Sequence, residues 1–135
     1  MTNGTERDRS ITRLNESAPD SVRITTALPE SEVDAARDAR RAGDQAFQMD
    51  ELEDARKHYV KAITADPENI RAHHNLAAVY LAGGRPADAR DILIKGSDLF
   101  PGSAELHYKL GVSLTRLNET GQAMKAFEQA IELDR

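Results

Sequence analysis

The chain has 135 residues, a formal net charge of −5 and no cysteine. This length predicts one domain, and 39% hydrophobic residues with only 4% aromatic ones support a modest core of small and aliphatic side chains. The lack of cysteine excludes disulfides, thiol nucleophiles and thiolate metal sites. The negative charge argues against bulk attraction to nucleic acid or to anionic membranes. No window approaches the roughly 18 apolar residues of a membrane span or resembles a secretory signal, so we expect a cytoplasmic location.

Residues 1–30 mix Ser, Thr, Asn, Pro and charges of both signs with scattered apolar residues. Such a segment cannot bury enough surface to offset the entropy of ordering, so we predict a disordered tail. Val22, Ile24 and Leu28 alternate with polar residues as in an extended strand lying on another surface, but composition favours the tail.

Helical periodicity begins after the tail. Ser31, with Asp34 three residues later, is placed to cap a first helix that runs to about Gln48. Further helices are expected over about residues 52–65, 70–82, 86 to before Pro101, 104–116 and 120–133.

The helical segments repeat one pattern at a spacing of 34 residues, which is typical of a solenoid. Three positions show the repeat: small residues, then alanine, then a large apolar residue. The members are Gly43, Ala77 and Gly111; Ala55, Ala89 and Ala123; and Tyr59, Leu93 and Phe127.

The breaks between paired helices fall on Asp50, Gly84 and Asn118, three residue types that tolerate a left-handed backbone at a helix end. Pro67 and Pro101 end the first two units.

Together these residues resemble the tetratricopeptide repeat over about residues 36–135. The resemblance implies an all-α fold, a right-handed superhelical stack of three helix-turn-helix hairpins (an α-solenoid). We place the repeats at about residues 36–69, 70–103 and 104–135 within a domain spanning 31–135. Alanines in the first helix predict that it is thinly packed and frays first, and Arg135 stands where a proline would end the third unit.

The sequence has no glycine-rich phosphate loop, no HExxH motif and no serine in a nucleophile elbow, so we expect no enzyme, no catalytic residue and no cofactor. His73 and His107 occupy equivalent positions that usually pack between helices. Because neither has a metal-ligating partner four residues away, we expect hydrogen-bonded spacers and no metal site.

In the family, the first helix of each hairpin lines a concave groove. The lining positions implied here include six basic residues and two acidic ones, Asp44 and Glu105, which gives +4 in a chain of −5. Such a reversal of sign attracts anionic ligands, so we predict a protein partner with an acidic or mixed segment. The candidate groove residues are Arg37, Arg40, Arg41, Phe47, Arg71, His74, Asn75, Tyr108, Lys109 and Arg116.

Some relatives bind the C-terminal carboxylate of chaperones through five positions of this groove, which fall here on Arg40, Asp44, Asn75, Glu105 and Lys109. Asp44 and Glu105 would repel a carboxylate, so we predict no ordinary clamp of this kind.

A second candidate surface is an apolar edge on the last helix, formed by Met124, Phe127, Ile131 and Leu133. It suits self-association, a docked partner or continuation in a longer chain, although tolerated exposure on a small array is an alternative.

The leading hypothesis is a non-enzymatic protein-interaction module, an adaptor or scaffold. The alternatives are a small secretion-type chaperone and a regulatory or targeting domain of a longer enzyme. RNA binding is disfavoured, because only Phe47 and Tyr108 could stack on bases in the groove.

Overall fold

The structure is a computed structural model that describes residues 30–135. Residues 1–29, which carry almost all of the predicted tail, lie outside the described residues. The described part contains six helices and no strand. They are α1 (Glu30–Gln48), α2 (Leu52–Ala65), α3 (Ile70–Ala82), α4 (Pro86–Leu99), α5 (Ala104–Arg116) and α6 (Thr120–Leu133).

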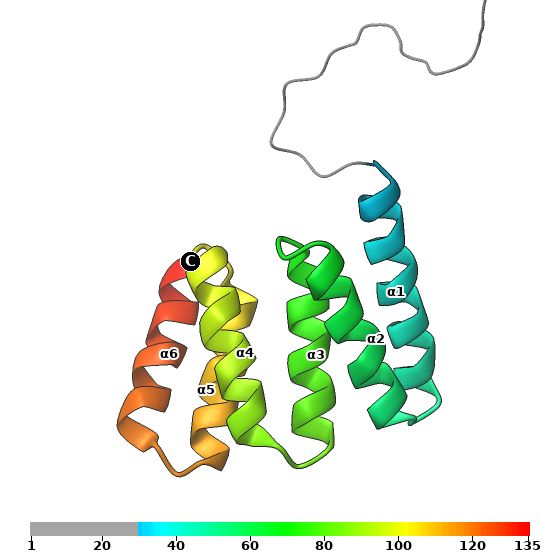
Figure 1. Ribbon diagram of the computed structural model, residues 1–135. Coiled ribbons are helices and arrows are strands. Elements are labelled where there is room, and N and C mark those ends of the chain that lie inside the picture. Colours follow the sequence, from blue (N-terminus) through cyan, green and yellow to red (C-terminus); the bar gives the residue numbers. More distant parts are fainter. Residues whose placement is uncertain (1–29) are drawn as a thin grey trace, which may run out of the picture.

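The helices form three antiparallel hairpins that follow one another across the molecule from right to left in Figure 1. Each helix packs on the next one in the chain, and α3 also contacts both α1 and α5. The first helices of the hairpins therefore lie side by side as one layer, with α2, α4 and α6 as the other. This arrangement confirms the predicted all-α solenoid of helical hairpins.

Each hairpin turns at the residue that the sequence indicated. Asp50, Gly84 and Asn118 have φ of 62°, 72° and 63°. In every turn the following amide donates back across the helix end, for example from Glu51 N to the Ala46 carbonyl at 2.9 Å. Arg85 N bonds the Tyr80 carbonyl and Glu119 N bonds the Leu114 carbonyl in the same way. These are the bonds of a Schellman end, which needs one residue in the left-handed region.

The prediction that Ser31 caps the first helix is wrong. The helix begins at Glu30 and includes Ser31. Glu32 in the first turn and Asp34 just after it favour the helix there, because the N-terminal end of the dipole attracts negative charge. Side-chain caps occur on the later hairpins instead: Asn69 Oδ1 accepts from Ala72 N at 3.1 Å, and Ser103 Oγ accepts from Leu106 N at 3.3 Å.

The small residues of the repeat let the two helices of a hairpin approach closely. A Cβ added to Gly43 would lie 2.6 Å from the Tyr59 ring, and one added to Gly111 would lie 2.6 Å from the Phe127 ring. Ala77 and Leu93 pack together in the middle repeat. The hairpins are thus closed by a ring or a leucine lying over a position without bulk.

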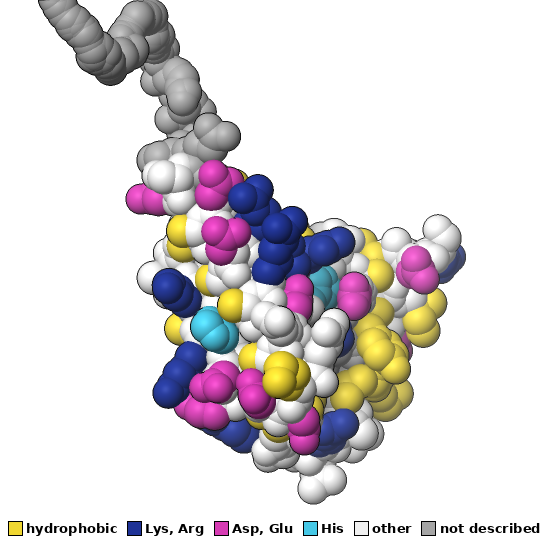
Figure 2. Space-filling model, turned by 90° about the vertical axis from the view of Figure 1, so that its right-hand side faces the viewer, with side chains coloured by type: hydrophobic (Ala, Val, Ile, Leu, Met, Phe, Trp, Pro, Cys, Tyr) yellow, Lys and Arg dark blue, Asp and Glu magenta, His cyan; other side chains and the backbone are white. Residues whose placement is uncertain are grey.

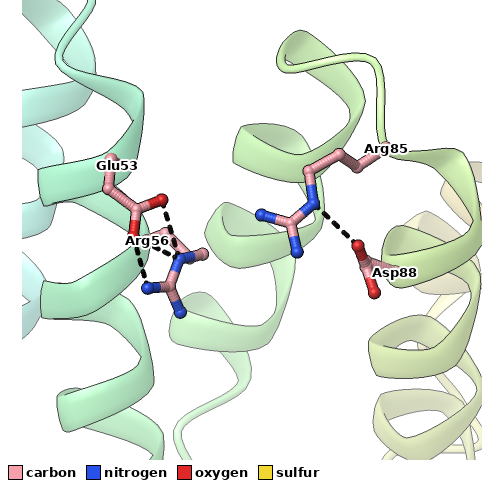
Figure 3. Close-up of polar contacts among 4 residues, drawn as sticks. All are labelled: Glu53, Arg56, Arg85 and Asp88. Carbon is pink, nitrogen blue, oxygen red and sulfur yellow. Dashed lines mark hydrogen bonds and ion pairs between the residues drawn. The ribbon is translucent and has the colours of Figure 1, made fainter.

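Ion pairs occupy the first turns of α2 and α4, in the layer of second helices (Figure 3). Arg56 donates to both carboxylate oxygens of Glu53, and Arg85 Nε donates to Asp88 Oδ2 at 2.7 Å. The Arg85 guanidinium also lies 4.9 Å from the centre of the Tyr80 ring. The hydrogen bond to Glu53 raises the pKa of Arg56 above its ordinary value.

Candidate functional site

The predicted groove residues all lie on α1, α3 and α5, the first helices of the hairpins, and we call the surface that they are predicted to form the groove face. Two of its arginines, Arg41 and Arg71, are exposed. Within residues 30–135 neither one makes an ion pair or a side-chain hydrogen bond. Arg37 differs, because its guanidinium lies 3.1 Å from Asp34 Oδ1 and 3.8 Å from Asp38 Oδ1.

Asp44 is the centre of a polar network that joins the first two repeats. Its Oδ2 accepts from Arg40 Nη1 at 3.0 Å, and its Oδ1 accepts from the Tyr59 hydroxyl and from Asn75 Nδ2, the latter at 2.9 Å. Two of the predicted groove donors, Arg40 and Asn75, are therefore directed at a carboxylate of the protein itself. Burial raises the pKa of Tyr59, and the hydrogen bond to Asp44 raises it further, so the phenol remains a donor.

In the other half of the groove face, Glu105 lies near two nitrogen atoms but beyond hydrogen-bond distance. Its Oε1 lies 3.8 Å from His74 Nε2, and its Oε2 lies 4.0 Å from Lys109 Nζ. Burial lowers the pKa of His74, an effect that Glu105 opposes and Lys109 reinforces. The other ring nitrogen, His74 Nδ1, is buried without a hydrogen-bond partner in the described part of the chain. A neutral imidazole tolerates this burial better than a charged one.

The remaining predicted groove residues are partly structural. Arg116 Nη1 donates to the Leu81 carbonyl at 2.9 Å, beside the bond that this carbonyl accepts from Gly84 N at 3.2 Å, and so ties the last repeat to the middle one. Phe47 packs against the core of the first repeat. Tyr108 is 56% exposed, and its ring lies 5.6 Å from that of Phe127.

The positive charge of the groove face is therefore less evenly spread than the count of +4 suggests. Arg40, Lys109 and Arg37 lie beside carboxylates, whereas Arg41 and Arg71 on α1 and α3 form no ion pair among the described residues. Figure 2 shows Lys and Arg side chains gathered toward the end at which α1 begins, and hydrophobic side chains gathered on the right. One half of the face offers exposed arginines that are unpaired within the described range, and the other half offers an exposed aromatic ring.

Only three of the four residues of the predicted apolar edge are exposed. Met124 is 56% exposed, Ile131 65% and Leu133 37%. Phe127 is half-buried instead, because its ring covers Gly111 inside the last hairpin. Because the Phe127 ring packs inside the hairpin, it is not part of the exposed edge.

The histidines at equivalent positions behave as helix spacers. His73 is 1% exposed, and its Nδ1 lies 3.0 Å from the Asn69 carbonyl. His107 Nε2 lies 3.2 Å from the Pro101 carbonyl. Over residues 30–135, no group of three or more His, Cys, Asp or Glu is placed to hold a metal ion. The helices of that same range include none long and apolar enough to cross a membrane.

The role of Asp44 as a junction was missed in the sequence, where it was interpreted only as a residue that would repel a carboxylate. A signal was present at Tyr59. The equivalent residues are Leu93 and Phe127, so a hydroxyl appears in the first repeat alone, and a buried tyrosine hydroxyl needs a partner.

Three stacked helical hairpins, with side chains of the first helices displayed on one face, define a solenoid scaffold of the class that binds other proteins. Two family models described as tetratricopeptide repeat match residues 46–108 and 104–135. The chain belongs to the tetratricopeptide repeat family.

Similar proteins share this repeat. The chain is 25% identical over 99 residues to Hsp70-Hsp90 organizing protein 1 of Glycine max, in a match that covers 73% of the chain and 17% of that protein. The N-terminal domain of stress-induced protein-1 from C. elegans is 25% identical, with a TM-score of 0.72 over 76% of this chain and 87% of that one. The crystal structure of MamA protein is 30% identical, with a TM-score of 0.71 over 74% of this chain and 55% of that one.

Proposed function

We propose that the chain is a non-enzymatic protein-interaction module, an adaptor or scaffold that holds an acidic or mixed segment of a partner on its groove face. The observation that carries this proposal is the pair of exposed arginines, Arg41 and Arg71, which make no ion pair with any residue of the range 30–135. They stand on one face of a protein whose net charge is −5. A local reversal of sign of this kind steers acidic segments toward the face and fixes their orientation.

The two halves of the groove face suggest how such a segment would lie. Carboxylates of the segment would pair with the guanidinium groups of Arg41 and Arg71, which can bind them bidentately. An apolar side chain further along would rest on the exposed Tyr108 ring. The segment would thus be acidic toward α1 and α3 and apolar toward α5.

The similarity to a Hsp70-Hsp90 organizing protein raises the question of a chaperone tail as partner. At the five clamp positions, Arg40 and Asn75 donate to Asp44, and Lys109 lies beside Glu105. A terminal carboxylate at this place would have to displace protein carboxylates from their donors. We therefore propose that the partner is recognised through internal acidic side chains at Arg41 and Arg71.

Nucleic acid is disfavoured as a partner. Tyr108 is the one strongly exposed aromatic ring on the groove face of the described residues, whereas single-stranded binding uses several stacking rings along a basic path. We propose a protein partner encountered in the cytoplasm.

The test is affinity capture from the native cell extract with three baits, read by mass spectrometry. The first bait is the wild-type chain, and the second carries Arg41→Glu and Arg71→Glu. The third carries Lys61→Glu and Lys95→Glu on exposed positions of α2 and α4. Both double variants change the net charge from −5 to −9, so they differ only in the face that is altered.

We expect proteins that are captured by the wild type and by the Lys61/Lys95 variant but are lost with the Arg41/Arg71 variant. Circular dichroism should show the same helix content for all three. If the Arg41/Arg71 variant retains the whole set, the groove face is not the binding surface and the proposal is wrong.

A further inference from the structure

A hollow lies at the C-terminal edge of the array, between α5 and α6. Its volume is about 380 Å³, and it is lined by Ala104, Glu105, Tyr108, Ala130, Ile131 and Asp134. Ile131 is 65% exposed on its wall and Ala130 is 8% exposed at its floor. The lining is mostly apolar and includes two carboxylates, those of Glu105 and Asp134.

The 34-residue repeat shows what kind of group occupies this hollow elsewhere in the molecule. Moving back by one repeat places Ala130 on Gly96 and Ile131 on Ser97, between α3 and α4. There the side chain of Leu106, from the next first helix, fills the position. Both Leu106 methyl carbons lie 3.5 Å from where a Cβ on Gly96 would stand, and Leu106 is 0% exposed. The equivalent hollow in the middle repeat is thus closed by a leucine.

The first boundary between repeats follows the same rule. Moving back once more places Ala130 on Ala62, which is 0% exposed and packs in one cluster with Ala72. Ala72 is the residue 34 positions before Leu106. At both internal boundaries an aliphatic side chain from a neighbouring helix covers the floor, and at the third boundary no residue of the described chain does so.

A second copy stacked head to tail does not supply the missing side chain. The residue of α1 that corresponds to Ala72 and Leu106 is Asp38, which is exposed. Docking α1 of another copy would press this carboxylate against Ile131 and close to Asp134, with the Arg37 guanidinium 3.8 Å away as its ion-pair neighbour. Burying a charge in apolar surroundings is unfavourable, a pair at this distance does not restore the lost solvation, and the like charge of Asp134 adds to the cost.

We propose that this hollow is a docking site for an amphipathic helix of a partner protein, which presents a leucine-sized side chain flanked by Lys or Arg. The side chain takes the place that Leu106 takes one repeat earlier, as a continuation of the stacking between repeats. The flanking cations pair with Glu105 and Asp134 in the lining of the hollow. The hollow adjoins the groove face, with which it shares Glu105 and Tyr108, but its ligand has the opposite charge to the ligand proposed at Arg41 and Arg71.

The probe is a fluorescent peptide that copies residues 103–118 with Glu105→Lys, held helical by a side-chain bridge on its outer face. Its matched control carries Leu106→Asp as well. We expect the probe to bind the full chain in fluorescence anisotropy. The control should bind at least about tenfold more weakly, which corresponds to a loss of about 1.4 kcal/mol of binding free energy. In the chain, Ile131→Asp should weaken the probe similarly, and Asp134→Lys should weaken it less.

Ile131 is largely exposed, so this substitution leaves the fold intact. The Arg41→Glu, Arg71→Glu chain should bind the probe as the wild type does, which distinguishes binding in the hollow from binding at the two arginines of the groove face. The proposal is overturned if the probe does not bind, if the control peptide binds equally well, or if Ile131→Asp has no effect. It is also overturned if sedimentation shows a wild-type dimer that Ile131→Asp dissociates, because a second copy would then be the occupant.

Discussion

The two halves of the groove face use their charges differently. In the half made by α1 and α3, Asp44 accepts hydrogen bonds from Arg40, Asn75 and the Tyr59 hydroxyl. In the half made by α3 and α5, Glu105 lies at 3.8 Å from His74 and at 4.0 Å from Lys109, without a hydrogen bond. The first carboxylate is part of the structure, and the second is a surface charge.

This difference shows which charges remain for a partner. A carboxylate that accepts from three donors makes those donors unavailable to a partner. Neighbouring cations outside the network can still pair with a partner's carboxylates. Arg41 and Arg71 are such cations. Counting charges on a predicted face therefore overestimates the number of residues that can bind, and the hydrogen-bond network decides which ones they are.

The largest expected effect comes from the boundary between the second and third repeats, which depends on apolar stacking. Leu106→Ala should lower the free energy of unfolding by about 3 kcal/mol, because it removes a fully buried side chain and leaves a cavity over Gly96. Urea unfolding followed by circular dichroism measures this change in the free energy of unfolding.

The matched change at the first boundary is Ala72→Gly, which should cost about 1 kcal/mol, mostly through helix propensity. Equal losses at the two boundaries would show that Leu106 is not the main contact between the last two repeats.

The next effect separates the two carboxylates. Asp44→Ala should lower the free energy of unfolding by about 2 kcal/mol, since it leaves the buried Tyr59 hydroxyl and the half-buried Asn75 amide without this acceptor. Glu105→Ala should change it by less than about 0.5 kcal/mol, as expected of an exposed charge without close hydrogen bonds. Thermal or urea unfolding of both variants at one pH gives the comparison. Losses of similar size would contradict the assignment of Asp44 as a structural junction.

The smallest effect is the pH dependence contributed by His74. Burial lowers its pKa in the folded chain below the ordinary value of 6.5, so the unfolded chain takes up a proton first as the pH falls. Its contribution is therefore neutral above pH 6.5 and destabilising below it, until the folded imidazole also protonates.

We expect the free energy of unfolding to fall less between pH 6.5 and pH 5 in His74→Gln than in the wild type. Lys109→Gln, which changes a charge near the same ring, is the control. An unchanged pH profile in His74→Gln would mean that the imidazole is solvated enough to titrate normally.

The sequence predicted the helices and turns well, because the signals are local and recur three times. Left-handed residues at Asp50, Gly84 and Asn118 and the close approach at Gly43 and Gly111 follow from the repeat itself. The predicted start of the first helix was wrong. The residues at this start precede the first repeat and have no equivalent in the other two repeats with which to compare them.

The arrangement of the groove face could be predicted only in part. Its lining positions follow from the repeat, but the partners of each charge depend on rotamers and on contacts between residues far apart in the chain. Asn75 and Asp44 are 31 residues apart, and Arg116 and the Leu81 carbonyl are 35 apart. The repeat spacing predicts that such residues lie near one another, but it does not predict which donor bonds to which acceptor.

The most direct test of the central claim is where an acidic ligand binds. The measurement is the change in backbone amide NMR shifts of the full chain during titration with a ten-residue peptide, rich in glutamate and carrying one leucine. We expect the largest changes on α1 and α3 around Arg41 and Arg71, smaller ones near Tyr108, and none of these in the Arg41→Glu, Arg71→Glu chain. Largest changes on α2 and α4, or shifts that persist in that variant, would contradict recognition through the groove face.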